Sequence, residues 1–143
     1  MTINEALHRI DNVKPNTYNP TEKIKWLSTL DGNIKKNIID THQNGDSIVF
    51  NGYDENIDLS TQLLVPAPHD DIYLFYLESK IDYWNGEIRK YNNSNAMFEN
   101  ALELFSKYYN RMNLPLGRNM KYSGSATTTP TTNGIIEITI EEA

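Results

Sequence analysis

Hydrophobic and polar positions alternate with a helical period from the start of the chain. Thr2 and Glu5 have the spacing of a capping box, in which each side chain hydrogen-bonds to the backbone N–H of the other residue. Apolar residues then recur three or four positions apart, at Ile3, Leu7, Ile10 and Val13. Pro15 ends the pattern, because proline is excluded from a helix interior. The sequence therefore predicts a helix over residues 3–13.

A longer stretch with the same period follows. Asn19 is a good N-cap residue, and Pro20 fits the first helical position, where its missing N–H is not needed. The apolar positions are Ile24, Leu27, Leu30, Ile34 and Ile38. Gly32 lies inside the pattern and suggests close packing or a local bend. We expect a second helix over residues 20–43.

Two further helices are expected in the second half of the chain. Residues 72–77 (IYLFYL) are all apolar or aromatic, so a helix here would be buried on most of its faces. This helix is expected over residues 69–90, at the centre of the domain. The polar run 92–95 offers several N-caps, and a last helix is expected over residues 94–112. Its apolar positions are Met97, Ala101, Leu104 or Phe105, Tyr108 and Met112.

Residues 44–68 carry turn signals instead of a helical period. Asn-Gly pairs occur at 44–45 and 51–52, and prolines at 66 and 68. Between the two pairs lies a β-like run, so residues 46–53 are expected to contain a short strand or hairpin. The sequence does not identify the partner of that strand.

The C-terminal end has a different composition from the rest. Residues 122–134 contain no charge and no large apolar residue after Tyr122, which predicts a flexible linker. Residues 135–143, the C-terminal arm, carry the β-branched and partly alternating pattern of a strand. Four isoleucines lie within six positions: Ile135, Ile136, Ile138 and Ile140. An apolar strand of this kind tends to aggregate unless a partner covers it, so we expect these isoleucines to dock on a partner's sheet edge. The alternative is a frayed terminus.

Together these patterns predict a mainly α fold. We expect a helical bundle of about four helices, with a short β-like loop segment and an extended C-terminal β-strand arm. The expected organisation is a helical domain at residues 1–121, a linker at 122–134 and a docking strand at 135–143. A chain of 143 residues has the length of one ordinary domain.

Composition narrows the functional classes. The formal net charge is −6, which disfavours general binding to nucleic-acid backbones. Cysteine is absent, so disulfides, thiol nucleophiles and cysteine-based metal sites are excluded, and a reducing compartment is expected. No apolar run approaches the length of a membrane span, and the first residues lack the features of a secretion signal. We therefore expect the protein to be assembled in the cytoplasm and not to associate with a membrane.

Candidate chemistry is sparse. The only cluster that resembles a metal or acid–base site is His69, Asp70 and Asp71. Adjacent residues rarely converge on one ion, so acidic residues at a helix start are the simpler interpretation. None of the familiar nucleotide-binding, hydrolase or metalloprotease motifs occurs. The chain is expected not to be an enzyme and to need no cofactor or metal.

A set of short motifs, taken in order and spacing, resembles the head–tail connector (adaptor) proteins of tailed phages and prophages of low-GC Gram-positive bacteria. The resemblance covers roughly residues 1–115 and contains no catalytic motif. Its motifs are Tyr18-Asn19-Pro20, Trp26-Leu27, Leu30-Asp31, Leu64-Val65-Pro66, Asp70-Asp71-Ile72-Tyr73, Ile81-Asp82-Tyr83, Asn85-Gly86-Glu87, Tyr91-Asn92-Asn93-Ser94 and Tyr109-Asn110-Arg111.

This resemblance implies a helical virion protein in a homo-oligomeric ring, typically of twelve subunits, beneath the portal protein. It also implies a stopper or tail protein bound below the ring, a C-terminal extension that engages the portal, and viral DNA that passes through without specific binding. Ring closure requires heterologous interfaces between subunits. Two alternatives remain open at this point: a tail-completion or stopper-like protein, and a small metal-dependent enzyme using His69, Asp70 and Asp71.

Overall fold

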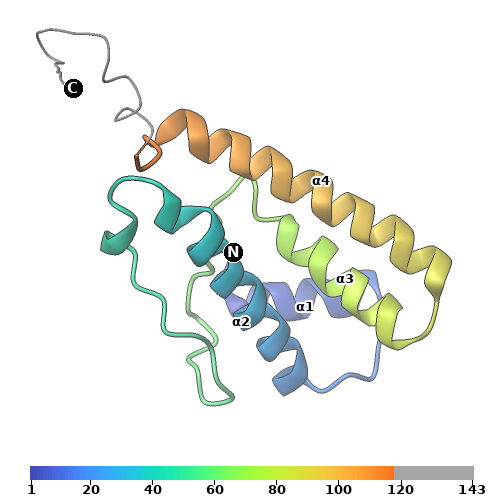
Figure 1. Cartoon of the computed structure of the whole chain (residues 1–143). Helices are drawn as coiled ribbons and strands as arrows, with labels where there is room; N and C mark the ends of the chain where they lie inside the picture. Colours follow the sequence, from blue (N-terminus) through green and yellow to red (C-terminus); the bar gives the residue numbers. More distant parts are fainter. Residues whose placement is uncertain (118–143) are drawn as a thin grey trace, which may run out of the picture.

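The computed structural model describes residues 1–117, which form four α-helices and two short 3-10 helices (Figure 1). The elements are α1 Ile3–Val13, α2 Pro20–Asn37, η1 Ile39–Thr41, η2 Gly45–Ser47, α3 Ile72–Trp84 and α4 Ile88–Met112. The predicted mainly α fold with four helices is confirmed. Within residues 1–117 there is no strand, so the strand expected at residues 46–53 is wrong. The predicted linker and docking strand lie outside the described residues.

Helix α1 has the predicted bounds and the predicted start. The Thr2 hydroxyl accepts a hydrogen bond from the Glu5 N–H at 3.1 Å, and the Thr2 N–H donates to Glu5 Oε1 at 2.9 Å. This pair is the expected capping box. The buried face of the helix consists of Ile3, Ala6, Leu7 and Ile10.

Helix α2 begins as predicted but ends at Asn37, six residues before the predicted end at residue 43. Asn19 Oδ1 accepts from the Thr21 N–H at 2.8 Å, as expected for an N-cap. At the other end, two side chains donate to the Ile38 carbonyl, which in a longer helix would accept from the His42 backbone N–H. The Ile38 carbonyl lies 2.7 Å from the Thr41 hydroxyl and 2.6 Å from Nδ1 of His42. The His42 N–H instead bonds to the Ile39 carbonyl, which tightens the chain into η1.

The break between α3 and α4 lies at residues 85–87, whereas the sequence analysis placed it at 91–93. Gly86 has φ = 73°, and it directly follows the C-cap residue of α3. The Gly86 N–H bonds to the Tyr83 carbonyl, and the Glu87 N–H to the Asp82 carbonyl. These two bonds form a Schellman motif, which ends a helix efficiently at a left-handed glycine. Gly86 is the sequence signal for this break, whereas the polar run 92–95, with its several N-cap residues, favours a break that is too late in the chain.

The polar run 92–95 can lie inside α4 because the Ser94 hydroxyl forms hydrogen bonds there. The hydroxyl lies 2.9 Å from the Lys90 carbonyl, one turn earlier, and 2.8 Å from Asp82 Oδ2 on α3. Asp82 also pairs with Lys14 of the segment after α1. A buried polar cluster therefore ties α1, α3 and α4 together at this end of the domain.

Helix α3 is the centre of the domain, as predicted. It contacts α1, α2 and α4, and its buried apolar residues are Ile72, Tyr73, Leu74, Leu77 and Ile81. Phe105 of α4 completes this core. The long connection between η2 and α3 runs down alongside α2 and returns to α3 (Figure 1).

A buried carboxylate holds that connection in place. Asp31 of α2 accepts hydrogen bonds from the hydroxyls of Tyr53 and Tyr73, both at 2.6 Å, and from the Leu64 N–H at 3.1 Å. Burial raises the pKa of Asp31, although these three hydrogen bonds partly oppose the shift. Burial beside this carboxylate also raises the pKa of both tyrosines. We refer to Asp31, Tyr53, Tyr73 and Leu64 as the Asp31 network.

Replacing Gly86 by alanine should cost about 1 kcal/mol of unfolding free energy, because an L side chain is strained at this positive φ. A Cβ there would meet no atom within 4 Å, so the backbone conformation alone decides the effect. Urea unfolding checks it, with Gly32→Ala as the control. Gly32 lies inside α2, and its added Cβ would make only an ordinary contact at 3.6 Å with Phe50. Gly32→Ala should therefore be neutral or stabilising. Equal stability of Gly86→Ala and the parent would contradict the prediction.

Candidate interaction surfaces

The predicted docking residues Ile135, Ile136, Ile138 and Ile140 lie outside the described residues, but the structure shows how the last described residues, 114–116, are held. The Gln43 N–H bonds to the Leu114 carbonyl and the Leu116 N–H to the Thr41 carbonyl, both at 2.8 Å. These bonds and an isolated bridge between His42 and Pro115 hold residues 114–116 antiparallel to 41–43. Apolar side chains are exposed at this exit patch: Met112, Leu114 and Leu116.

His42 lies beside the exit patch and connects it to the helices. Its Nε2 lies 2.6 Å from Asn110 Oδ1 of α4, and its ring packs edge-on against Tyr109 with centroids 4.8 Å apart. Its Nδ1 contacts the carbonyl of Ile38 at the C-terminal end of α2. One buried side chain therefore links α2, η1 and α4 where the C-terminal segment begins.

His69, Asp70 and Asp71 do not converge on a common point. Asp70 lies 3.2 Å from the amino group of Met1, and Asp71 lies 3.6 Å from Arg9. The His69 ring instead packs against Tyr108 and Phe105 of α4. Among residues 1–117, no group of three or more histidine and acidic side chains could hold a metal ion. The three residues are used to attach the start of α3 to its neighbours.

The junction of α3 and α4 presents aromatic side chains to solvent. Tyr83, Trp84 and Ile88 are 51%, 60% and 61% exposed, and we call these three residues the aromatic corner. The Tyr83 ring lies 5.2 Å from that of Trp84 and 5.5 Å from that of Tyr91. The corner forms because the apolar sequence of α3 extends to Trp84, directly before the Schellman motif that ends the helix. Exposed Trp and Tyr side chains are typical of the centres of protein interfaces.

Basic residues lie close to the aromatic corner in the sequence. Lys80, Arg89 and Lys90 lie within four residues of it in sequence, and Lys90 pairs with Glu87 at 3.1 Å. Within the described part of the chain, neither Lys80 nor Arg89 has an acidic partner within 4 Å. The Lys80 ammonium group lies over the Tyr76 ring, 5.5 Å from its centroid. Arg89, next to Ile88 in the chain, therefore supplies a positive charge without an acidic partner beside the aromatic corner.

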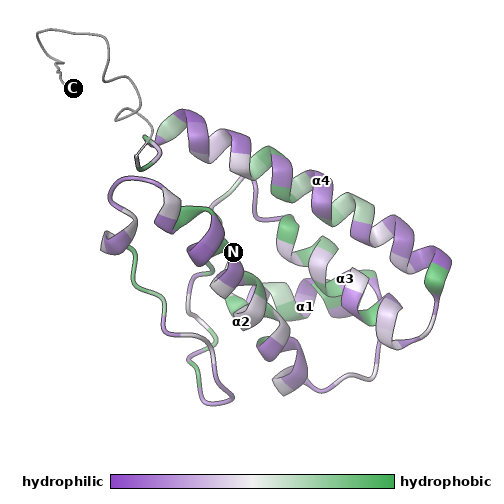
Figure 2. Ribbon diagram, viewed as in Figure 1, coloured by the Kyte–Doolittle hydropathy of each residue, from purple (hydrophilic) through white to green (hydrophobic). Residues whose placement is uncertain are grey.

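Helix α4 also has exposed apolar residues along its length. Of its 25 residues only Ser94 and Phe105 are buried, while Met97 and Leu104 are exposed. These two lie seven residues apart and so share one face. Figure 2 shows hydrophobic and hydrophilic bands alternating along α4. The helix therefore offers more apolar surface than its contact with the rest of the domain uses.

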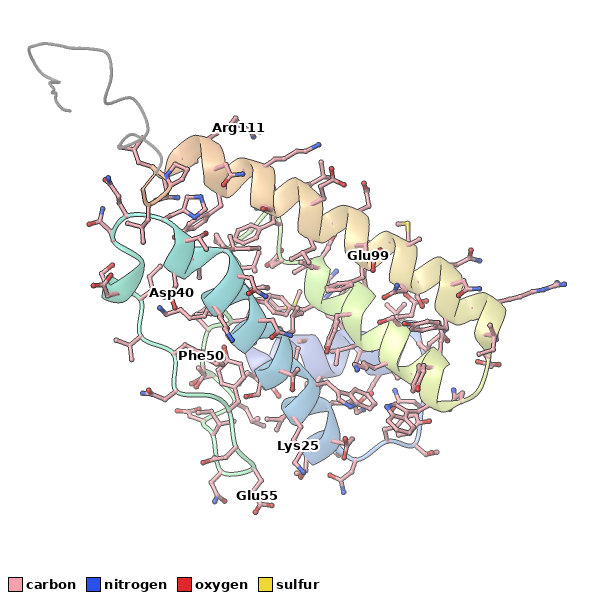
Figure 3. The ribbon with its side chains drawn as sticks, in the orientation of Figure 1. Lys25, Asp40, Phe50, Glu55, Glu99 and Arg111 are labelled. Atoms are coloured by element: carbon pink, nitrogen blue, oxygen red, sulfur yellow. The ribbon has the colours of Figure 1, made fainter. Side chains whose placement is uncertain are left out.

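The connection between η2 and α3 carries an acidic surface. Residues 54–60, the acidic loop, expose Asp54, Glu55, Asp58 and Leu59. Figure 3 shows Glu55 at the outer tip. The hydrogen bond from the Ser60 N–H lowers the pKa of Asp58, which keeps its carboxylate charged.

The acidic loop is held firmly in shape. Asp54 Oδ1 and Asp58 Oδ1 each accept a hydrogen bond at 2.9 Å from the backbone N–H two residues ahead. The Leu59 carbonyl accepts from the Asn4 N–H at the start of α1. Tyr53, just before the loop, is bound to Ser28 and Asp31 of α2. Two helices thus fix the loop from either side.

The sequence assigns the aromatic residues of this region, Tyr83 and Trp84 among them, to the core or to a subunit interface without deciding between the two, and it does not single out the acidic loop as a surface. Both surfaces had a signal in the sequence. Gly86 marks the end of a helix that is still apolar, and no Lys or Arg occurs between Lys36 and Lys80. What the sequence could not supply is which of the aromatic residues in α3 remain uncovered by α4.

Over residues 1–117, none of the helices combines the length and the apolar character needed to cross a bilayer. Comparison with protein-family models, with curated proteins and with solved structures finds no match for this chain.

Proposed function

We propose that this chain is a structural head–tail connector (adaptor) subunit of a tailed phage. In this proposal, copies of the chain form a ring beneath the portal, join the capsid to the tail and let DNA pass. The observation that carries it is the exposed aromatic corner, with Tyr83 and Trp84 more than half exposed on a well-packed helical domain. An apolar surface of this kind is typical of a protein that works by binding other proteins.

The role of the motif residues supports the proposal. Asp31, Leu64 and Tyr73 meet in the Asp31 network although they lie far apart in sequence. Asp82 and Ser94, from two other motifs, bond to each other at 2.8 Å. Residues that carry the resemblance to connector proteins are therefore residues that hold this fold together. A resemblance based on such residues is one of fold.

The proposed attachment to the portal uses the C-terminal arm. The described residues end at the exit patch, and residues 122–134 can span up to about 43–47 Å when extended. The arm would then add a strand to a sheet edge of the portal, with Ile136, Ile138 and Ile140 facing an apolar groove. Attachment and ring formation would thus use different surfaces.

Deleting residues 135–143 should abolish incorporation into portal complexes and leave the helix content and melting temperature nearly unchanged, because the core lies upstream. Purified portal rings are mixed with full-length or truncated chain, and co-sedimentation measures incorporation. Ile138→Pro and Thr139→Pro provide a matched pair. Successive N–H groups of an edge strand point in opposite directions, so only one of the two prolines should remove a ladder hydrogen bond, and the two should reduce incorporation to different extents. Normal incorporation of the truncated chain would refute the arm's role.

A further inference from the structure

We infer that the aromatic corner of one copy binds the acidic loop of a second copy, and that this contact joins neighbouring subunits. The inference deepens the proposed function, on which it rests for the closure of such contacts into a ring. Its partner is a second copy of this chain, and both halves of the contact lie within residues 1–117.

The two surfaces are complementary in charge. Arg89 follows Ile88 of the aromatic corner and has no acidic partner within 4 Å in the described residues. The acidic loop carries three exposed acids, Asp54, Glu55 and Asp58. These acids likewise have no basic partner within 4 Å among residues 1–117. Opposite charges at the rim of an apolar contact favour association and fix its register.

The surfaces also match in their apolar content. Leu59 is exposed within the acidic loop, and Val49 is exposed earlier in the same connection. Either can pack against the rings of Tyr83 and Trp84, and Trp and Tyr are among the residues that carry most of the binding energy at interface centres. Charge at the rim and apolar groups at the centre are the usual anatomy of an interface.

Within one copy, the aromatic corner cannot contact the acidic loop. Figure 1 shows the α3–α4 junction and the loop between η2 and α3 on different sides of the molecule, with α1 and α2 between them. The contact must therefore join two copies through unlike surfaces. Such heterologous contacts generate a ring when the rotation closes.

The acidic loop is a better candidate for this site than the C-terminal arm, which is also acidic and apolar. Backbone hydrogen bonds from α1 and side-chain bonds to α2 hold the loop in shape before any contact forms. A preformed surface loses less conformational entropy on binding than a segment at the end of a flexible linker, which is what the sequence predicts for the arm. Crosslinking distinguishes the two, because a cysteine in the arm would be linked to the corner in place of one in the acidic loop.

Cysteine crosslinking tests the contact in the full-length chain, which has no cysteine of its own. Asn56→Cys marks the acidic loop and Asn92→Cys, one turn after Ile88, marks the corner. Both positions are exposed, and both changes keep every charge and aromatic group. A mixture of the two variants, treated with a short thiol crosslinker at high concentration and on portal rings, should give a linked heterodimer. A chain with both substitutions should give a ladder of linked subunits.

The control is Asn100→Cys, on an exposed part of α4 away from the corner. Equal linkage of this variant to Asn56→Cys would mean non-specific contact and would overturn the inference. Linkage of Asn92→Cys to Ile138→Cys, in place of Asn56→Cys, would assign the corner to the arm and overturn it too. So would absence of the Asn56–Asn92 link both in free solution and on portal rings.

Binding strength provides a second readout by sedimentation equilibrium. Trp84→Ala should weaken self-association by about 30-fold or more, as expected for a central interface residue. Arg89→Glu or Glu55→Arg alone should weaken it about 2- to 5-fold, and both changes in one chain should restore it, because every copy then carries both halves of the reversed pair. Failure of that rescue would contradict the assigned contact. Portal binding without the crosslink would refute only this inference, whereas the crosslink without portal binding would refute only the proposed function.

Discussion

A chain carrying Leu77→Asp is expected not to fold. Leu77 is 0% exposed and lies on α3 between the other three helices, so the new carboxylate would be buried without a partner. Loss of the leucine alone costs about 2–5 kcal/mol, and an unpaired buried charge adds several more. A domain of this size has a total stability of about 5–15 kcal/mol, which the combined cost approaches or exceeds.

Leu104→Asp is the matched control, because Leu104 is 53% exposed on α4 and its aspartate would remain hydrated. Circular dichroism should show a cooperative melt for Leu104→Asp near that of the parent, and little helix for Leu77→Asp. A parent-like melt for Leu77→Asp would mean that α3 is peripheral. The pair therefore separates a general effect of added charge from an effect of burial.

The helices themselves were largely predictable from local sequence. Thr2 with Glu5, and Asn19 with Pro20, are start signals that act through neighbouring backbone groups, so the starts of α1 and α2 agree with the predictions. The end of α2 was not predictable in the same way. It depends on His42, whose other ring nitrogen contacts Asn110, a residue 68 positions away.

Residues 46–53 show how tertiary contacts override a local strand signal. The β-like run from Ser47 to Phe50 has no partner strand within the described residues, so its backbone pattern gains no ladder. What orders the following residues is Tyr53, which bonds to Ser28 and Asp31 of α2. A propensity scale contains no information about such a contact.

The same limit applies to the candidate surfaces. The composition of α3 predicts a buried helix, yet Tyr83 and Trp84 at its end are exposed while Tyr73 at its start is completely buried. Sequence period alone does not distinguish these aromatic residues. The difference arises because Gly86 turns the chain into α4 just after Trp84, which depends on where α4 then packs.

The Asp31 network should be the most sensitive polar feature of the domain. Asp31 is 0% exposed and accepts from three donors: the Tyr53 and Tyr73 hydroxyls and the Leu64 N–H. Asp31→Ala would leave all three without an acceptor, at about 1–3 kcal/mol each, for a total loss of at least about 3 kcal/mol. Asp31→Asn keeps one oxygen for Tyr53 and Leu64 and disturbs mainly Tyr73, so it should cost about 1–3 kcal/mol.

The pH dependence has a definite sign. Burial raises the pKa of Asp31 in the folded chain above its ordinary value, so the folded state holds this proton more tightly than the unfolded state does. Its contribution to stability is therefore largest below the ordinary carboxyl pKa and falls as pH rises toward the folded-state pKa. Above the folded-state pKa the contribution stays constant. Asp31→Asn removes this titration while leaving the other carboxylates in place.

The measurement is urea unfolding of the parent and of Asp31→Asn over the acid pH range. The difference between their unfolding free energies isolates Asp31 from other carboxyl groups. One of these is Asp58, whose lowered pKa makes stability rise with pH. The stability advantage of the parent over Asp31→Asn should shrink as pH rises from the ordinary carboxyl range. An advantage that grows with pH would mean that the three hydrogen bonds outweigh burial and that the folded state favours the ionised carboxylate. Equal unfolding free energies of Asp31→Ala and the parent would show that the network does not hold the η2–α3 connection to α2.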